Sequence, residues 1–179
     1  MKFFKYAFGL IGCNIYRLAR VFPNNDPIMG IMLPFARKDK WWKAPAFAFL
    51  TMFSFDLVTS GIGLWTWVTA ITYALLGAAF HFYFRFKEKV SIKTYLGAGA
   101  LGVLAFDFVT GVLLGPALFG MPIEMAFLGQ IPFTIMHLMS VSALIIVVTP
   151  YLDKDAENVP VIVLKKSVQA IGQLFKLRV

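Results

Sequence analysis

The chain has 179 residues, of which 59% are hydrophobic and only 15% are charged, whereas soluble domains are typically about half apolar and about a quarter charged. With a mean hydropathy of +0.75, this composition indicates a protein embedded in a lipid bilayer and leaves no room for a second, soluble domain of ordinary size. The net charge of +8 comes from short Lys and Arg clusters between apolar runs and at the two ends. The sequence has neither a continuous basic face nor a known nucleic-acid-binding module, so we do not expect nucleic acid as a partner.

The first two apolar segments differ in length. Residues 3–22 are long enough for a membrane helix but end in two arginines, which must reach the headgroups or face protein. After the turn "FPNND", either Asn25 or Asp26 is expected to cap a second helix. Its apolar run, 28–36, covers less than half of the bilayer at about 1.5 Å per residue. This segment is therefore either a short helix completed by its neighbours or a re-entrant segment.

Four later stretches approach the length of about 20 apolar residues that a spanning helix needs. They cover residues 44–59, 65–84, 95–113 and 123–149. The first is short unless Trp41 and Trp42 form its interfacial belt. The last is long, contains Pro132 and is expected to stop at Pro150, with a kink or a tilt. Together with the two earlier segments, these stretches predict an all-α bundle of about six transmembrane helices.

The distribution of basic residues predicts the orientation of this bundle. Loops 37–43 and 85–93 each contain four Lys or Arg residues, whereas the alternate loops 59–64 and 111–122 contain none. The positive-inside rule then places the basic loops and both termini in the cytoplasm of a multi-pass protein of the cell membrane. A re-entrant second segment would instead give five helices and an outside N-terminus.

The C-terminal segment is expected to differ from the bundle. We assign residues 1–150 to the transmembrane bundle and residues 151–179 to a polar joint followed by a basic amphipathic helix. Apolar residues at helical spacing support that helix: Val161, Leu164, Val168, Ile171 and Phe175. We expect it to lie on the lipid of the inner leaflet, and the alternative is a docking helix for a cytoplasmic partner.

Two similar segments each place an acid inside an apolar run. "FSFDLVTSGIGL" at 53–64 nearly recurs as "LAFDFVTGVLLG" at 104–115, which pairs Asp56 with Asp107. This pairing suggests a duplicated helical hairpin whose two copies run parallel. Both acids would then lie at the same depth near the outer surface and face one cavity. The alternative is a structural role, in which each acid caps a helix or bonds an arginine of the first segment.

Other polar residues extend the possible wall of this cavity. Gln130, Thr134 and His137 are spaced four and three residues apart and so share one face of the last helix. Trp65 stands near the outer start of the fourth helix and is either an aromatic wall or a belt residue. An intramembrane histidine such as His137 is also commonly a structural hydrogen-bonding residue between helices.

The sequence lacks the motifs of several enzyme classes. It contains no phosphate-binding glycine loop, no HExxH and no GxSxG. Its single cysteine, Cys13, excludes an intrachain disulfide and a thiolate metal cluster. The pair of aspartates does not match the intramembrane aspartyl proteases, whose second acid follows a Gly-x-Gly motif, because "GIG" at 61–63 comes after Asp56. We therefore expect no enzyme activity, no cofactor and no metal.

Four stretches carry a family resemblance: "RLARVFPNNDPIMGIMLPFA" at 17–36, "FSFDLVTSG", "FDFVTGVLLGPALFGMP" and "IPFTIMHLMSVSALII". Over roughly residues 15–148 the chain is similar to a group of small polytopic proteins that resembles the substrate-capture (S) components of energy-coupling-factor (ECF) vitamin transporters. The resemblance implies six helices with both ends cytoplasmic and a micronutrient site near the outer face. It also implies two kinds of partner, a membrane coupling subunit and paired ATPase subunits.

The predicted function is that of an integral membrane substrate-binding component of a micronutrient uptake transporter, with a small polar or cationic solute as its ligand. The residues expected to bind the solute are Asp56, Asp107, Asn24, Asn25, Trp65, Gln130 and His137. Two alternatives stay open. One is a structural or assembly subunit of a larger membrane complex without a ligand, and the other is a proton-coupled carrier that acts alone.

Overall fold

The computed structural model describes residues 4–20 and 26–156, and within these ranges the protein is all-helical, without a β-strand. The prediction of an all-α protein is confirmed in this respect. The elements in chain order are α1 (Phe4–Ala19), α2 (Pro27–Lys38), α3 (Lys43–Val58), α4 (Leu64–Arg85), α5 (Ile92–Asp107), the π-helix η1 (Phe108–Leu114), α6 (Gly115–Phe119) and α7 (Ile123–Leu152). The amphipathic helix expected in residues 157–179 lies outside the described residues.

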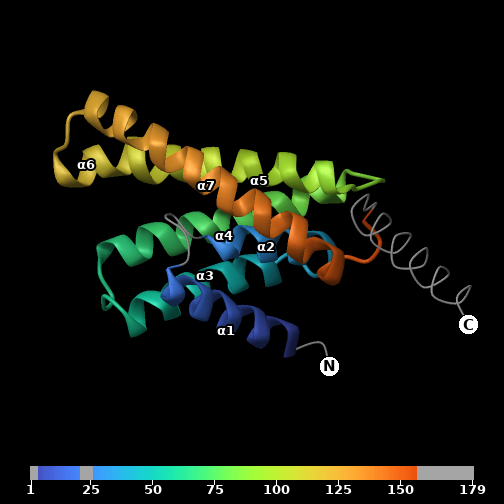
Figure 1. The fold of residues 1–179 in the computed structure, drawn as a ribbon. Helices are drawn as coiled ribbons and strands as arrows, with labels where there is room; N and C mark the ends of the chain where they lie inside the picture. The colour runs from blue at the N-terminus through green and yellow to red at the C-terminus, as the bar shows by residue number, and fades with distance from the viewer. Residues whose placement is uncertain (1–3, 21–25, 157–179) are drawn as a thin grey trace, which may run out of the picture.

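The helices form two antiparallel hairpins around a short central helix (Figure 1). Helices α3 and α4 make the first hairpin, and α5, η1 and α6 pack against α7 in the second. Both hairpins turn at the same end of the molecule, on the left in Figure 1. The N-terminus of α1 and the C-terminus of α7 both lie toward the opposite end. This arrangement is the one that a duplicated hairpin predicts.

Helix length supports fewer membrane spans than the sequence predicts. Within residues 4–20 and 26–156, three helical stretches are long and apolar enough to cross a membrane: Leu64–Arg85, Ile92–Phe119 and Ile123–Leu152. Helices α1 and α3 have 16 residues each, or about 24 Å at 1.5 Å per residue, and fall short of a hydrocarbon core of about 30 Å. The structure therefore supports a membrane-embedded protein with three candidate spans, and the count of six is not supported.

Helix α2 is short and is surrounded by other helices of the protein. Nine of its twelve residues are buried, and it packs against α1, α3, α4, α5 and α7. Asp26 caps its start by accepting a hydrogen bond from the backbone N–H of Ile28 at 2.8 Å, and Pro27 occupies the first helical position. The close approach of α5 to α2 depends on Gly102, where a Cβ would lie 2.8 Å from the Met29 side chain. The cap of this central helix thus lies inside the bundle.

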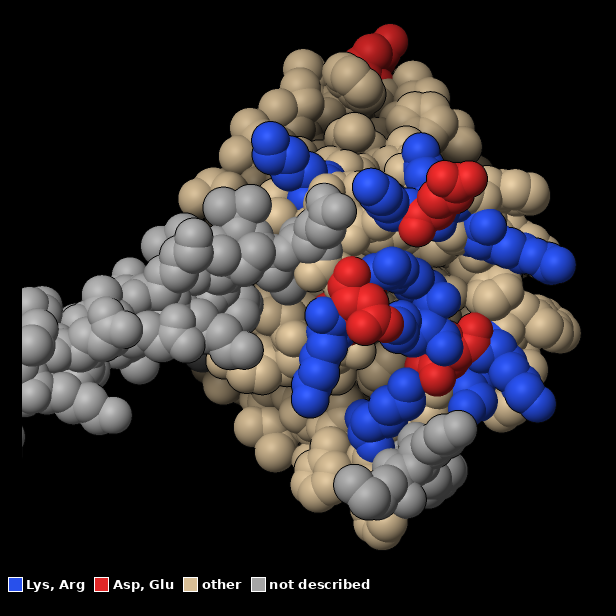
Figure 2. Space-filling model, turned by 90° about the vertical axis from the view of Figure 1, so that its right-hand side faces the viewer, with Lys and Arg blue, Asp and Glu red and all other residues tan. Residues whose placement is uncertain are grey.

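Charged residues of the described part of the chain gather at one end of the molecule, and Figure 2 shows Lys and Arg side chains crowded on that face. A fully buried carboxylate, Asp153, links the helices there. It accepts a hydrogen bond from the Tyr95 hydroxyl at 2.7 Å and forms an ion pair with Arg37. The hydrogen bond from Lys38 to exposed Asp155 lowers the pKa of that carboxyl. These hydrogen bonds and ion pairs connect the ends of α2, α5 and α7 to one another.

The last helix runs further than its prolines suggest. The sequence predicts a stop at Pro150, but α7 continues to Leu152 and includes both Pro132 and Pro150. Asp153 then ends the helix, and its backbone N–H donates to the Thr149 carbonyl at 2.8 Å. The extension brings the Asp153 carboxylate within reach of the basic residues of α2.

Candidate functional site

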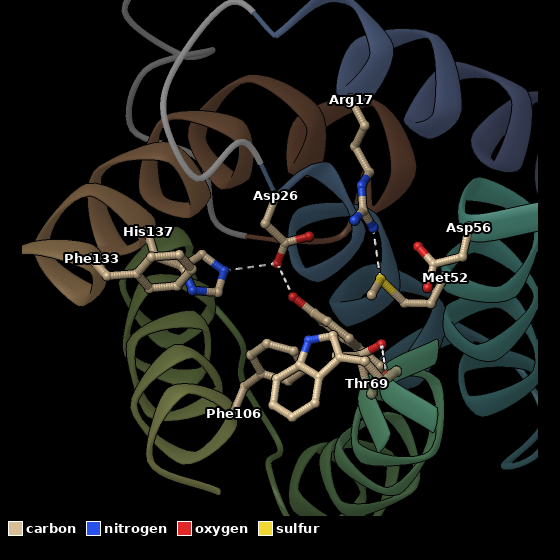
Figure 3. A pocket seen from close by; sticks show the side chains of 10 residues that line it. Arg17, Asp26, Met52, Asp56, Thr69, Phe106, Phe133 and His137 are labelled. Carbon is tan, nitrogen blue, oxygen red and sulfur yellow. Dashed lines mark hydrogen bonds and ion pairs between the residues drawn. The ribbon is translucent and has the colours of Figure 1, made fainter. Parts of the chain in front are cut away.

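A cavity of about 290 Å³ lies between the two hairpins, beside the start of α2 (Figure 3). Six helices or caps contribute to its wall: Arg17 from α1, Asp26 from the cap of α2, Met52 and Asp56 from α3, Trp65, Thr69 and Tyr73 from α4, Phe106 from α5, and Phe133 and His137 from α7. Four of these side chains are carboxylic acids or nitrogen bases that can carry charge. Ionisable side chains are costly among apolar helices and usually mark a functional site, so this cavity is the candidate functional site.

The centre of the site is a chain of three groups, Asp26, His137 and Asp107, which we call the acid–imidazole chain. The Nε2 atom of His137 lies 3.1 Å from Asp26 Oδ2, and its Nδ1 atom lies 2.9 Å from Asp107 Oδ1. All three side chains are buried, with exposed fractions of 7%, 3% and 2% for Asp26, His137 and Asp107. Because a carboxylate can only accept, a proton must lie on each N···O line. Both hydrogen bonds of the acid–imidazole chain form when the imidazole is protonated and donates to both carboxylates. The three groups together then carry one net negative charge.

Asp26 has two further partners that fix its position. Its Oδ1 atom accepts from the N–H of Ile28 at 2.8 Å, and its Oδ2 atom also accepts from the hydroxyl of Tyr73 on α4. The positive end of the α2 dipole additionally favours negative charge at this cap. The residue that starts the central helix therefore also orients the histidine of α7.

Asp107 stands behind the histidine and does not line the cavity. It accepts from the hydroxyl of Thr134 at 2.6 Å, and that hydroxyl also accepts from Gln130 Nε2 at 3.4 Å. The π-helix η1 begins directly after Asp107, and such turns are often found at functional sites. Within η1, a Cβ at Gly111 would lie 1.9 Å from Gln130 Oε1, so only glycine lets this glutamine approach. Asp107 and its partners thus position His137 from behind.

On the α3 side, two opposite charges line the cavity without forming an ion pair. Asp56 is half-buried, and its carboxylate has no hydrogen bond or ion pair with any described residue. The Arg17 guanidinium lies over the Phe55 ring, 4.1 Å from its centroid, and among the described residues it donates only to the Met52 sulfur, at 2.6 Å. Figure 3 shows both groups on the Met52 side of the cavity. A thioether is a weak acceptor, so the part of the chain that the structure describes leaves the donors of Arg17 poorly satisfied.

Aromatic rings close much of the remaining wall. Tyr73 and Phe106 pack with their ring centroids 4.3 Å apart, and Phe133 lies edge-on to His137 at 6.0 Å. Trp65 is 38% exposed and completes the wall near the start of α4. Ring faces of this kind attract cations and cover apolar groups. The cavity therefore combines charged groups with a largely aromatic lining.

The structure brings together some of the residues that the sequence suggests. Asp56, Trp65 and His137 line the cavity. Asp107 contacts His137, and Gln130 reaches the site only through Thr134. Asn24 and Asn25 lie outside the described residues.

Sequence reasoning does not assign three polar members of the site to solute binding: Asp26, Tyr73 and Arg17. The sequence indicates Asp26 only as a helix cap, and it does not single out Tyr73. It suggests Arg17 only as a bond partner for an acid, although a charged side chain within an apolar segment is by itself a signal for a functional site. Tyr73, an uncharged residue of an apolar helix, gives no signal of this kind.

The described residues contain no group of three or more His, Cys, Asp or Glu side chains arranged to hold a metal ion. Comparisons with protein-family models, with curated proteins and with solved structures found no match. The function of the cavity must therefore be inferred from its residues. Those residues can hold a charged solute by ion pairs, hydrogen bonds and ring contacts.

Proposed function

We propose that this protein is the substrate-binding component of a micronutrient uptake transporter and captures a small polar or cationic solute in the cavity beside Asp56. The observation that supports this most strongly is the Asp56 carboxylate, which lines the cavity and has no partner among the described residues. An ionised carboxylate surrounded by apolar helices is unfavourable unless water, a partner or a ligand solvates it. A cationic group of a solute would supply that partner.

The net charge of the site supports a cation. Asp26, Asp56 and Asp107 contribute three negative charges, and Arg17 and a doubly donating His137 contribute two positive ones. One negative charge is left over. In a site of low dielectric constant, this surplus attracts a solute with a net positive charge and disfavours a simple anion.

The position of the cavity supports capture from outside. Asp56 is close to the end of α3 and Trp65 is close to the start of α4, so the cavity lies next to the α3–α4 turn. The basic face lies at the other end of the bundle. In our proposal the basic face and both termini are cytoplasmic, according to the positive-inside rule, and the cavity is near the outer face. We also propose that the six helices α1 to α5 and α7 are all embedded in the membrane.

The proposed function also requires partners. The sequence has no phosphate-binding loop that could drive transport, and as a binding subunit the protein carries out no chemical step. We therefore propose, in line with the resemblance to ECF S components, that a membrane coupling subunit and ATPase subunits act with it. Purification under mild detergent, followed by identification of co-purifying proteins, tests for these partners.

Mass spectrometry of the purified protein tests solute binding. Small molecules are extracted from wild-type protein, from Asp56→Asn and from Glu124→Gln, which removes an exposed acid that is outside the cavity. We expect one compound to be retained by wild type and by Glu124→Gln, and lost from Asp56→Asn, while all three elute as folded protein at the same volume. Equal retention by Asp56→Asn would contradict the proposal. Absence of any compound, together with a stable complex of other proteins, would instead indicate an assembly subunit.

A further inference from the structure

We infer that the solute is an amino-acid-like zwitterion, a single small molecule that carries both an ammonium and a carboxylate group. The inference rests on the proposed function, because it takes the cavity beside Asp56 to be the solute site. It goes further than the proposed function, because the net negative charge of the cavity alone predicts only a cationic ligand, whereas the inference requires an anionic group on that ligand as well. The anionic group is assigned to Arg17 and the ammonium group to Asp56.

Arg17 is the reason to expect a carboxylate. Its guanidinium lines the cavity but forms no ion pair with any described residue. Among the described residues its direct contacts are the Phe55 ring at 4.1 Å and the Met52 sulfur at 2.6 Å, and it also interacts electrostatically with Asp26 at longer range. The ring holds the guanidinium plane in place, and a guanidinium offers five N–H donors in a fork that matches a carboxylate. The side chain is thus positioned in advance for a planar anion.

Asp56 is the reason to expect an ammonium group. It comes from α3, the same helix that supplies Met52 and Phe55, the described side chains in direct contact with Arg17. The other acid of the wall, Asp26, already has Ile28, Tyr73 and His137 as partners. Asp56 is therefore the wall carboxylate that remains open to a donor. Since Arg17 and Asp56 face one cavity, one small molecule can contact both.

The size and lining of the cavity limit the rest of the molecule. Its volume of about 290 Å³ is at the lower end of the range of about 300–1,000 Å³ for ligand pockets. The rings of Trp65, Tyr73, Phe106 and Phe133 can cover an apolar chain of a few carbon atoms. The surplus negative charge further predicts that a second ammonium on that chain strengthens binding.

A direct ion pair between Arg17 and Asp56 is the competing explanation for two such charges in one cavity. If a side-chain rotation joined them, neither would need a ligand. The two explanations predict different effects of neutralising Arg17. A ligand contact makes the loss specific for the carboxylate of the ligand, whereas an internal pair makes it independent of the ligand's charges.

A matched set of compounds tests the inference by titration calorimetry on the full-length protein in detergent. L-norleucine carries both charges, pentylamine lacks the carboxylate, hexanoate lacks the ammonium, and L-lysine adds a second ammonium. We expect norleucine to bind at least about tenfold more tightly than pentylamine or hexanoate, because each loses a charge-assisted bond. Lysine should bind more tightly than norleucine.

Variants of Arg17 assign the carboxylate contact. In Arg17→Gln we expect norleucine to bind no better than pentylamine, while Arg17→Lys keeps part of the preference. Arg20→Gln is the control, because it removes an exposed arginine outside the cavity and should leave the preference unchanged. Elution volume and melting temperature show whether each variant is folded.

Three results would overturn the inference. Pentylamine binding as tightly as norleucine, with both lost in Asp56→Asn, would leave the proposed function standing and remove the zwitterion. A co-purifying compound without a carboxylate would do the same. Absence of binding by all four compounds, with no co-purifying compound, would remove both the inference and the proposed function.

Discussion

Removal of the imidazole from the acid–imidazole chain should destabilise the protein strongly. In His137→Leu, the buried carboxylates of Asp26 and Asp107 lose their shared donor, whose nitrogens lie 3.1 and 2.9 Å from them. Asp26 keeps its bonds to Ile28 and Tyr73, and Asp107 keeps only Thr134 among the described residues. Breaking a buried pair by removing one partner typically costs about 3–5 kcal/mol. We expect a loss of that size in the free energy of unfolding.

The measurement is equilibrium unfolding of detergent-solubilised protein, with His81→Leu as the matched control. His81 makes a hydrogen bond between Nδ1 and the Ala36 carbonyl at 2.9 Å, and its loss should cost about 1 kcal/mol. Adding Asp107→Asn to His137→Leu should recover part of the loss, since it neutralises one unpaired charge. If His137→Leu were no more destabilising than His81→Leu, the three groups would not form the charged chain that we describe.

Two further predictions concern the packing of the bundle. Asp153→Asn should lower the melting temperature and cost about 3–5 kcal/mol of stability, because this buried carboxylate pairs with Arg37. Asp155→Asn removes an exposed ion pair with Lys38 and should lower the melting temperature much less, and equal shifts would contradict the assignment. Gly77→Ala should cost about 1–3 kcal/mol, because its Cβ would lie 2.9 Å from the Pro45 nitrogen, whereas Gly97→Ala meets nothing within 4 Å. Thermal unfolding of the two alanine variants side by side checks this difference, and equal stability would refute the close contact of α3 with α4.

Hydropathy predicts the helices well but cannot show what surrounds them. The run 28–36 is as apolar as a lipid-facing segment, yet in α2 it is buried by five other helices. A buried core helix and a membrane span need the same kinds of side chain. Among the described residues, length and hydropathy support three spans rather than the six expected from sequence, while the predicted positions of the helices are close to those observed.

The sequence repeat predicts the two hairpins, but it does not fix how each acid is rotated about its helix. Asp56 faces the cavity, whereas Asp107 contacts His137 from behind. One physical difference between the copies is the π-helix that begins after Asp107, which changes the direction of the following side chains. Equivalent positions in two similar segments can therefore have different neighbours.

Long-range contacts account for what sequence reasoning misses. Asp26 and His137 are 111 residues apart in the chain, and Tyr73 is 47 residues from Asp26. No local pattern indicates that a helix cap, a tyrosine and a histidine will meet. The helical spacing of Gln130, Thr134 and His137, by contrast, is local, and these residues do form one continuous network with Asp107.

Chemical labelling of Asp56 tests the solute site most directly. Protein stripped of small molecules is treated with a hydrophobic carbodiimide, with and without the co-purifying solute, and modified carboxyls are quantified by peptide mass spectrometry. Glu124, an exposed acid outside the cavity, serves as an internal control. We predict that the solute lowers modification of Asp56 several-fold and leaves that of Glu124 unchanged. Equal modification of Asp56 with and without solute would contradict a binding site in this cavity.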